Sequence, residues 1–360
     1  MKTTEKKYFV QQLEKWNRDS NKRAMPWKGE KDPYKIWLSE IILQQTRVEQ
    51  GLDYYNRFVK TFPDVKQLAN APETKVFKLW EGLGYYTRCK NLIAAAKYIA
   101  NDLKGKFPSS YEDILSLKGV GPYTAAAIGS FAFNLPHAVV DGNVFRVLSR
   151  FFGIDIPIDS IEGKKLFTQL ANELLDKQQP GIYNQALMDF GAVICKPQLP
   201  LCNNCVLQNK CYAFNNNIVA KLPVKEKSII KKTRWFYYVV GKYKGKTYVK
   251  KRGAGDIWEN LYEFILTESK SELELTDLKR QPVLKQLLDP KNAEISVVSK
   301  IYRQVLTHQV IIGRFITAEF SKPAPLKGYE LVNIEQMEHL PFPKFISNYL
   351  KDKDVSLNLL

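Results

Sequence analysis

Four cysteines fall within 17 residues of this 360-residue chain, in the spacing Cys195-x6-Cys202-x2-Cys205-x5-Cys211. Such density predicts a metal site, because unrelated thiols seldom gather in one short loop. Structural zinc mostly uses two close pairs of ligands, whereas here only Cys202 and Cys205 form a close pair. An iron–sulfur cluster needs four thiolates around one core, which a short loop can supply. Ligand chemistry therefore favours iron–sulfur and leaves zinc open.

The fifth cysteine, Cys89, lies far from this loop, and an odd total argues against a disulfide framework. Residues 1–16 carry several charges and contain no apolar signal core. No segment approaches the roughly 20 apolar residues that span a bilayer. We therefore expect a soluble protein in the cytoplasm without membrane contact. We also expect a monomer, and we interpret Cys89 as a small buried or surface residue rather than a ligand.

The net charge indicates the kind of partner. The chain has 54 Lys and Arg residues against 37 Asp and Glu residues, which gives a net charge of +17 at pH 7. An excess of this size favours nucleic acid, because neutralising phosphates releases their counterions. A lysine-rich solvated surface gives the same count, so the charge supports nucleic-acid binding without establishing it.

Helical periodicity predicts one helix after another through roughly the first 220 residues. One helix is expected to begin at Asp32-Pro33, which combines an N-cap with proline at the first helical position. Another is expected after residue 143, with the apolar residues of 144–151 on one face. The sequence thus predicts an all-α domain over residues 1–221 that ends in the cysteine loop, residues 195–211.

Beyond residue 222 the pattern changes. A basic segment over 222–233 predicts an extended linker. Residues 235–240 and 247–250 flank two glycines, as in a β-hairpin, and residues 305–320 predict a strand broken at Gly313. We expect a multidomain chain whose second domain, over 234–360, is a smaller α/β domain.

A glycine-rich turn joins two predicted helices over residues 111–133. Gly119 and Gly121 permit a sharp turn, and Val120 between them can fill the space between the helices. Free backbone N–H groups at the start of the second helix can hold a phosphate. A plain corner between helices explains the glycines equally well, but together with the basic charge they favour anchoring of a DNA backbone.

Two carboxylates stand out for opposite reasons. Glu40 shares a helix face with Ile36, Trp37 and Leu43, where desolvation would raise its pKa and keep a proton available; the alternative is a surface glutamate at the edge of the apolar stripe. Asp141 precedes a helix whose dipole favours an anion, although aspartate is also an ordinary N-cap. A neutral acid and an anion are the two groups needed to break a glycosidic bond.

The chain resembles the MutY adenine DNA glycosylases of the helix-hairpin-helix superfamily, clearly from about residue 25 to 211 and more faintly to the C-terminus. The matching motifs are Pro26-Trp27, residues 37–46, 80–86, 117–124, 140–144 and 184–186, and the cysteine loop. This resemblance implies a [4Fe–4S] cluster on the four cysteines, and duplex DNA carrying adenine opposite 8-oxoguanine or guanine as the partner. It also implies a bacterial enzyme acting at the nucleoid.

The endonuclease III branch of this superfamily shares the fold, the aspartate and the cluster. That branch carries a lysine after the hairpin, which attacks the sugar as an amine nucleophile. Tyr123 stands at that position here, and Lys118 precedes the hairpin. Together with Glu40, this resemblance implies a monofunctional glycosylase that does not cut the strand.

The resemblance also assigns roles to individual residues. Glu40 would protonate adenine N7 and then activate water, Asp141 would stabilise the sugar cation, and Tyr123 and Asn143 would hold the two carboxylates. Three residues would line the pocket for the flipped adenine: Trp27, Leu43 and Gln185. Four would contact the opposing base: Gln45, Thr46, Leu83 and Tyr85, although Tyr85 is also consistent with ordinary packing. Lys28 stands where some relatives carry arginine.

The second domain resembles the Nudix-like domain with which these enzymes sense 8-oxoguanine, through residues 256–264. The family's Phe-Ser-His triplet is Leu306-Thr307-His308 here. Thr307 keeps the hydroxyl and with it the capacity to hydrogen-bond the oxidised base. A Nudix hydrolase acting on free nucleotides is the alternative, and the missing acidic hydrolase box disfavours it. A non-catalytic DNA-binding protein with a structural cluster is a third class, and the presence of both carboxylates disfavours it.

Overall fold

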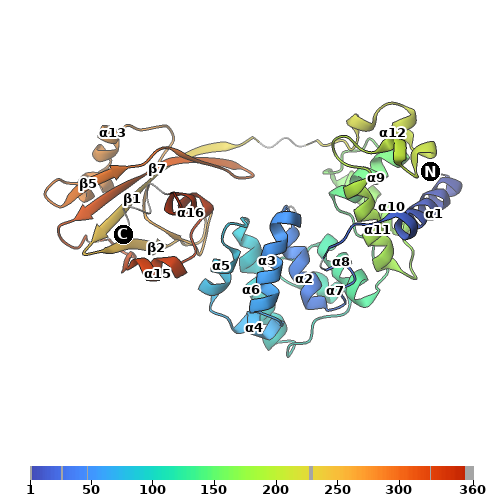
Figure 1. Cartoon of the computed structure of the whole chain (residues 1–360), viewed down its shortest axis with the longest axis horizontal. Helices are drawn as coiled ribbons and strands as arrows, with labels where there is room; N and C mark the ends of the chain where they lie inside the picture. The colour runs from blue at the N-terminus through green and yellow to red at the C-terminus, as the bar shows by residue number, and fades with distance from the viewer. Residues whose placement is uncertain (1, 26, 47, 227–229, 325, 353–360) are drawn as a thin grey trace. The chain divides into compact units, whose positions relative to one another are not determined.

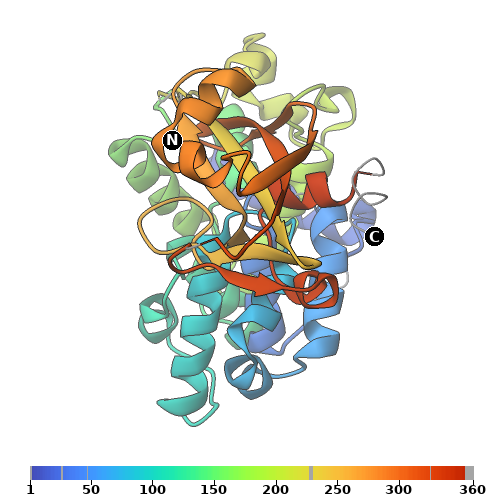
Figure 2. The same ribbon diagram turned by 90° about the vertical axis from the view of Figure 1, so that its left-hand side faces the viewer.

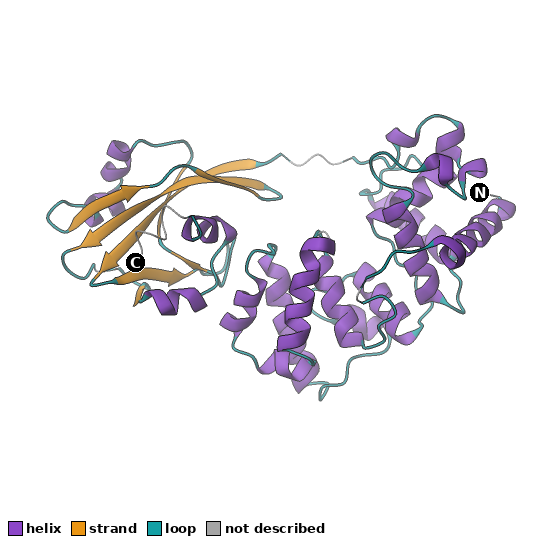
Figure 3. Ribbon diagram, viewed as in Figure 1, coloured by secondary structure: helices purple, strands orange, loops and turns teal. Residues whose placement is uncertain are grey.

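Helices occupy the chain as far as Lys221, and strands follow from Lys232, in the predicted order (Figures 1 and 3). The computed structural model describes residues 2–25, 27–46, 48–226, 230–324 and 326–352. Pro26 of the expected Pro-Trp motif and the linker residues 227–229 lie outside these ranges. Among the described residues, no helix is both long and apolar enough to cross a membrane.

The chain divides into two compact units. The first combines Met1–Ala69 with Ala94–Ser228, and the second combines Asn70–Ile93 with Ile229–Leu360. These units differ from the expected contiguous division at residue 221, because a helical segment of the N-terminal part joins the second unit. We describe each unit by itself.

The first unit is helical. Its helices are α1 (Thr3–Ser20), α2 (Pro33–Leu43), α3 (Val48–Thr61), α4 (Val65–Asn70), the later part of α6 (Tyr86–Asn101), α7 (Tyr111–Ser116), α8 (Pro122–Phe133), α9 (Gly142–Phe152), α10 (Ile161–Leu174), α11 (Pro180–Val193) and α12 (Tyr212–Asn215), with short 3-10 turns at Cys202–Asn204, Gln208–Lys210 and Val219–Lys221. The predicted start of α2 is confirmed, since the Asp32 side chain accepts a hydrogen bond from the Tyr34 N–H over 2.9 Å.

Helices α1, α9, α10 and α11 share one hydrophobic core. The predicted apolar face of α9 is confirmed: it is buried there together with Phe9, Phe167 and Phe190. Full burial of each such side chain stabilises the fold by about 1.5–3 kcal/mol. This core matters for function because it fixes the start of α9 against α11, and both helices carry predicted site residues.

The glycine-rich turn between α7 and α8 has the predicted form. Gly119 adopts a left-handed φ of +82°, and Val120 between the two glycines is buried at 8 % exposure. Gly121 is the N-cap of α8, which begins at Pro122 and therefore leaves its first backbone N–H groups without helical partners. The helix-hairpin-helix is thus present at residues 111–133.

The second unit is built on an eight-stranded mixed sheet, which Figure 2 shows from another side than Figure 1. Its strands are β1 (Lys232–Tyr243), β2 (Lys246–Lys251), β3 (Tyr262–Glu263), β4 (Ile265–Ser269), β5 (Ala293–Val298), β6 (Tyr302–Val305), β7 (Gln309–Phe320) and β8 (Glu330–Val332). The order is β3-β2-β1-β7-β5, with β4 also paired to β1, β6 to β7 and β8 to β2. The predicted hairpin is the antiparallel pair β1–β2.

Helices cover both faces of this sheet because successive residues of β1 and β7 point to opposite sides. On one side Tyr237 and Ile316 pack with α13 (Leu275–Arg280) and α14 (Pro282–Leu287). On the other, Phe315 stacks on Tyr349 of α16 (Lys344–Leu350), with ring centroids 3.9 Å apart. The remaining helix of the C-terminal part is α15 (Ile334–His339).

The segment Asn70–Ile93 contributes α5 (Glu73–Trp80) and the start of α6 to this unit. Hydrogen bonds attach it to the C-terminal part of the chain. The Lys78 ammonium donates to the Leu340 carbonyl over 3.0 Å, and Lys90 pairs with Glu259 over 2.6 Å. Such contacts between distant segments leave no periodic signal, so sequence patterns did not predict this grouping.

The expected break at Gly313 is wrong. Strand β7 runs unbroken from Gln309 to Phe320, and the interruption falls before it, between β6 and β7. Gly313 is paired with Phe236 of the parallel strand β1, and a Cβ at this position would lie 1.8 Å from the Phe236 carbonyl oxygen. Glycine is therefore required by the close approach of two central strands.

We predict that Gly313→Ala destabilises the second unit by about 3 kcal/mol or more, because the added methyl must push two paired strands apart. The thermal unfolding midpoint of the β-rich transition measures this loss. Gly253→Ala is the matched control, since a Cβ there meets nothing within 4 Å. Equal midpoints for the two variants would contradict the role assigned to Gly313.

Candidate active site

Glu40 lies near the end of α2 and is 7 % exposed, which excludes the surface alternative. The Tyr123 hydroxyl, from the first turn of α8, donates a hydrogen bond of 2.7 Å to Glu40 Oε2. Burial raises the pKa of Glu40 to about 7; the hydrogen bond from Tyr123 lowers it, and the charge of Asp141 raises it. Glu40 can therefore hold a proton and give it up at neutral pH.

Asp141 is the N-cap of α9 and is surrounded by donors. It accepts hydrogen bonds from the backbone N–H groups of Asn143 and Val144 over 2.9 and 2.8 Å, and from Asn143 Nδ2 over 2.6 Å. Burial raises the pKa of Asp141, while these hydrogen bonds and Arg146 lower it. The burial effect is the larger, so the pKa of Asp141 is raised overall, and the three donors limit this rise because they stabilise the ionised form.

The two carboxyl groups share one electrostatic environment. The charge of Asp141 acts on the pKa of Glu40, and both charges act on Tyr123. Burial first, and then these two anions, raise the pKa of the Tyr123 phenol well above its ordinary value. The fold thus places two carboxyl groups and a phenol, from three helices that are separate in the sequence, where their charges interact.

Arg146 was missed by the sequence patterns. Its guanidinium donates to Asn143 Oδ1 over 2.9 Å and to the Cys195 carbonyl over 2.7 Å, and so connects the amide that holds Asp141 to the cysteine loop. Arg146 is 8 % exposed. Its place as the fifth residue of α9, between the apolar residues Phe145 and Val147, was the only available signal.

Asn184 has a similar supporting role on α11. Its Oδ1 accepts from the Val139 N–H over 3.0 Å, and its Nδ2 donates to Ser130 Oγ and the His137 carbonyl. Asn184 is 2 % exposed and satisfies all these groups at once. It therefore fixes the extended segment that leads into Asp141.

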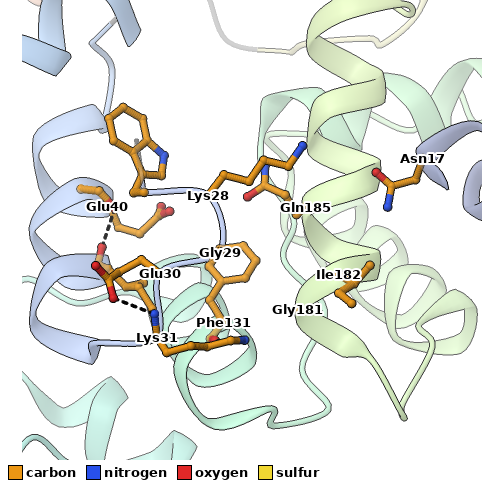
Figure 4. A pocket seen from close by; sticks show the side chains of 13 residues that line it. Asn17, Lys28, Gly29, Glu30, Lys31, Glu40, Phe131, Gly181, Ile182 and Gln185 are labelled. Atoms are coloured by element: carbon orange, nitrogen blue, oxygen red, sulfur yellow. Dashed lines mark hydrogen bonds between the residues drawn. The ribbon is translucent and has the colours of Figure 1, made fainter. Parts of the chain in front are cut away.

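A pocket of about 210 Å³ opens beside Glu40 (Figure 4). It is lined from α1, α2, α8, α11 and the turn after residue 26, by Asn17, Trp27, Lys28, Gly29, Glu30, Lys31, Ile36, Ser39, Glu40, Phe131, Gly181, Ile182 and Gln185. Trp27 and Gln185, both expected in the pocket, are among these residues. Leu43 is not; it is half-buried and packs over Gly51 of α3.

The residues expected at the opposing base fall into separate places. Gln45 is exposed with a φ of +57° just after α2, and Thr46 follows it. In the second unit, Leu83 is 6 % exposed, and the Tyr85 hydroxyl lies 2.7 Å from Thr307 Oγ1. The fold thus brings Tyr85 and Thr307 together from positions 222 residues apart.

His308 is exposed, and its carbonyl accepts the Lys232 N–H over 3.0 Å at the start of β1. Its imidazole therefore stands at the surface beside Thr307. The exposed Tyr85 side chain, at 43 %, is not the ordinary core residue that packing alone would predict.

The four loop cysteines are all half-buried. Burial raises the pKa of Cys205 to about 12, and the charges of Cys195, Cys211 and Cys202 act on it as well. In the part of the chain that the structure describes, no three His, Cys, Asp or Glu side chains converge closely enough to hold a single metal ion. The [4Fe–4S] cluster expected on these four cysteines therefore stays a prediction.

Residues 38–174 match the model of the HhH-GPD superfamily base excision DNA repair proteins. The adenine DNA glycosylase of Buchnera aphidicola subsp. Acyrthosiphon pisum is 31 % identical over 350 residues, which cover 96 % of this chain and 98 % of the relative. The chain belongs to the adenine DNA glycosylase family. The mouse adenine DNA glycosylase is 41 % identical over 206 residues, 54 % of this chain and 40 % of that protein.

Solved structures agree on the helical fold of this adenine DNA glycosylase family member. A thermostable thymine-DNA glycosylase matches with a TM-score of 0.55 and 30 % identity, covering 59 % of this chain and 98 % of that chain. An endonuclease III–DNA complex matches with a TM-score of 0.53 at 19 % identity, over 61 % of this chain and 99 % of that chain. At that identity the second likeness concerns the fold alone.

We predict that Glu40→Gln stabilises the protein above pH 7 and has little effect near pH 4. Between the ordinary pKa of 4.5 and the folded value of about 7, the unfolded carboxyl ionises while the folded one keeps its proton. Stability therefore falls as the pH rises through this window, by at most about 3 kcal/mol, and glutamine removes that loss. Thermal midpoints from pH 4 to 8, with the exposed Glu49→Gln as control, measure it; a constant difference across pH would refute it.

Proposed function

We propose that this protein hydrolyses the N-glycosidic bond of adenine opposite 8-oxoguanine or guanine in duplex DNA, as a step of base-excision repair. The observation that carries the proposal is the buried carboxyl of Glu40, whose pKa near 7 suits a general acid and which lines a pocket. Family membership indicates which nucleobase is removed, because the relatives are named adenine DNA glycosylases.

The adenine reaches this pocket only after it leaves the base stack, since its N7 and sugar are inaccessible to a buried acid inside the duplex. Among the lining residues, Trp27 offers an apolar surface and Gln185 offers an amide. The Trp27 ring is itself held edge-on to Tyr55, with centroids 5.3 Å apart. Both residues therefore present rigid surfaces to a flat base.

Glu40 transfers its proton to adenine N7, and the bond between C1′ and N9 breaks with its electron pair going to the base. The sugar is left as an oxocarbenium ion. Water then adds its oxygen to C1′, and the proton it loses returns to the Glu40 carboxylate. The carboxyl is thus acid in the first step and base in the second, which a pKa near 7 allows in both directions.

Asp141 stabilises the sugar cation. Its three hydrogen-bond donors hold both oxygens in place and keep the group anionic while the cation forms. Asn143 supplies two of the three donors, and so acts as the positioning residue for this anion. Tyr123 is likewise the positioning residue for Glu40, because its hydroxyl donates a hydrogen bond to Oε2 of that carboxyl.

The site favours hydrolysis without strand cleavage. A lyase needs a free amine to attack the sugar, and the Tyr123 phenol provides none. The two lysines of the pocket are both engaged: Lys28 Nζ donates to Asp189 over 2.8 Å, and Lys31 Nζ donates to the Phe131 carbonyl over 3.0 Å. Both nitrogens are therefore committed to acceptors of the protein and are not free to approach the sugar.

The [4Fe–4S] cluster would be held by Cys195, Cys202, Cys205 and Cys211. When bound, it supplies a cross-link that orders the loop of residues 195–211. The Cys195 carbonyl already accepts from Arg146, so an ordered loop also supports Asn143 and Asp141. None of the bond-breaking steps uses the cluster.

DNA is held outside the pocket by two kinds of contact. The hairpin glycines Gly119 and Gly121 leave backbone N–H groups for a phosphate, and Gln45, Thr46 and Leu83 contact the bases around the flipped nucleotide. The second unit acts as the Nudix-like reader of 8-oxoguanine, with hydroxyls of Tyr85 and Thr307 and the imidazole of His308 available for hydrogen bonds. The protein works as a monomer in the cytoplasm, at the nucleoid.

The proposal predicts alkali-dependent cleavage of a duplex carrying adenine opposite 8-oxoguanine. The wild type should leave an abasic site at the adenine, which hot alkali converts to a strand break. Glu40→Gln should bind the same duplex and excise at least about 10²-fold more slowly, because it has no proton to give. Glu49→Gln should behave as wild type. Strand breaks without alkali, or tight binding with no excision by the wild type, would contradict the proposal.

The pH dependence of single-turnover excision tests the acid directly. The rate should be level below pH 7 and fall about tenfold per pH unit above it, as Glu40 loses its proton. Tyr123→Phe removes the hydrogen bond that lowers this pKa, so the midpoint should move to higher pH. The exposed Tyr98→Phe is the control. A midpoint unchanged in Tyr123→Phe would count against the assigned pair.

A further inference from the structure

A buried anion on α11 takes no part in the chemistry described above. The Asp189 side chain is 0 % exposed, and it does not line the pocket. Arg23 Nη1 donates to its Oδ1 over 2.8 Å, and Lys28 Nζ donates to its Oδ2 over the same distance. A buried carboxylate needs such partners, and Asp189 has two cations within ion-pair distance.

Two side-chain amides also donate hydrogen bonds to Asp189. Asn21 Nδ2 donates to Asp189 Oδ2 over 2.9 Å, and Gln185 Nε2 donates to Oδ1 over 2.8 Å. An ionised carboxylate has about four acceptor positions and no donor. The four donors therefore occupy the capacity of Asp189, and each of them is held in one orientation.

This arrangement decides which end of the Gln185 amide is free. Gln185 lines the pocket and lies one turn before Asp189 on α11. Because the carboxylate can only accept, the Gln185 nitrogen must face Asp189 and the oxygen must face elsewhere. Figure 4 shows the Gln185 and Glu40 side chains reaching towards one another from opposite walls of the pocket. The wall opposite the acid therefore presents a hydrogen-bond acceptor.

We propose that Asp189 is a positioning residue that sets base specificity, by fixing Gln185 so that its Oε1 accepts from the exocyclic amino group of a flipped purine. This inference rests on the proposed glycosylase activity. A 6-aminopurine such as adenine offers a donor at that place. Hypoxanthine carries an oxygen there, and two acceptors facing each other in a desolvated pocket exclude it.

The test compares single-turnover excision of adenine and of hypoxanthine, each opposite 8-oxoguanine. The wild type should prefer adenine by about 10²-fold or more. Asp189→Leu keeps a similar volume but accepts no hydrogen bond, so the Gln185 amide can turn over and present its nitrogen. The preference should then fall at least about tenfold. The exposed Asp102→Leu is the control and should keep the wild-type preference.

A second pair of variants separates amide orientation from general damage. Gln185→Met has no amide to orient, so it should lose the preference by itself, and adding Asp189→Leu should not change the ratio further. If Asp189→Leu does not fold, Asp189→Ser replaces it, because serine is too short to reach Gln185 and stays polar. The ratio of the two bases is the readout, since a merely structural role would slow both excisions together.

The outcomes are distinct. A folded Asp189 variant whose preference stays within twofold of wild type overturns the positioning role while leaving the glycosylase proposal intact. A further fall in the ratio when Asp189→Leu is added to Gln185→Met also overturns it. A wild type that excises neither base defeats the proposed function, and the positioning role with it.

Discussion

The hydrogen bond between Tyr123 and Glu40 joins two helices through a largely buried carboxyl. Desolvation raises the pKa of this acid, and the hydrogen bond from the phenol lowers it, so that the pKa lies at about 7. The result is an acid poised where a proton can move in both directions. The other parts of the site place their groups relative to Glu40. Helix α9 carries the carboxyl of Asp141 at its start, α11 carries the amide of Gln185, and the turn after residue 26 carries the indole of Trp27.

Local sequence signals predicted local structure well. The cap at Asp32, the turn around Val120 and the apolar face of α9 each depend on residues that are neighbours in the chain. Gly313 shows where such signals fail. Read along the chain, a glycine interrupts a strand, but here its missing side chain makes room for a parallel strand more than 70 residues away.

In the candidate site, too, sequence signals predicted some residues and missed others. The two carboxylates could be predicted because one lies on an apolar helix face and the other begins a helix. Arg146 and Asp189 could not, because a charged residue in an apolar helix has no pattern of its own until its partners fold around it. Those partners lie between 3 and 168 residues away in the sequence. The joining of Asn70–Ile93 to the second unit is unpredictable for the same reason.

Asn184 and Gln185 are adjacent on α11 but serve different parts of the site. Asn184 hydrogen-bonds to the segment that ends at Asp141, and Gln185 lines the pocket. Consecutive residues of a helix point about 100° apart, so rotation or sliding of α11 would disturb the sugar side and the base side of the site together. Both sides of the site therefore depend on the position of this one helix, and a shift of α11 cannot be corrected on one side without changing the other.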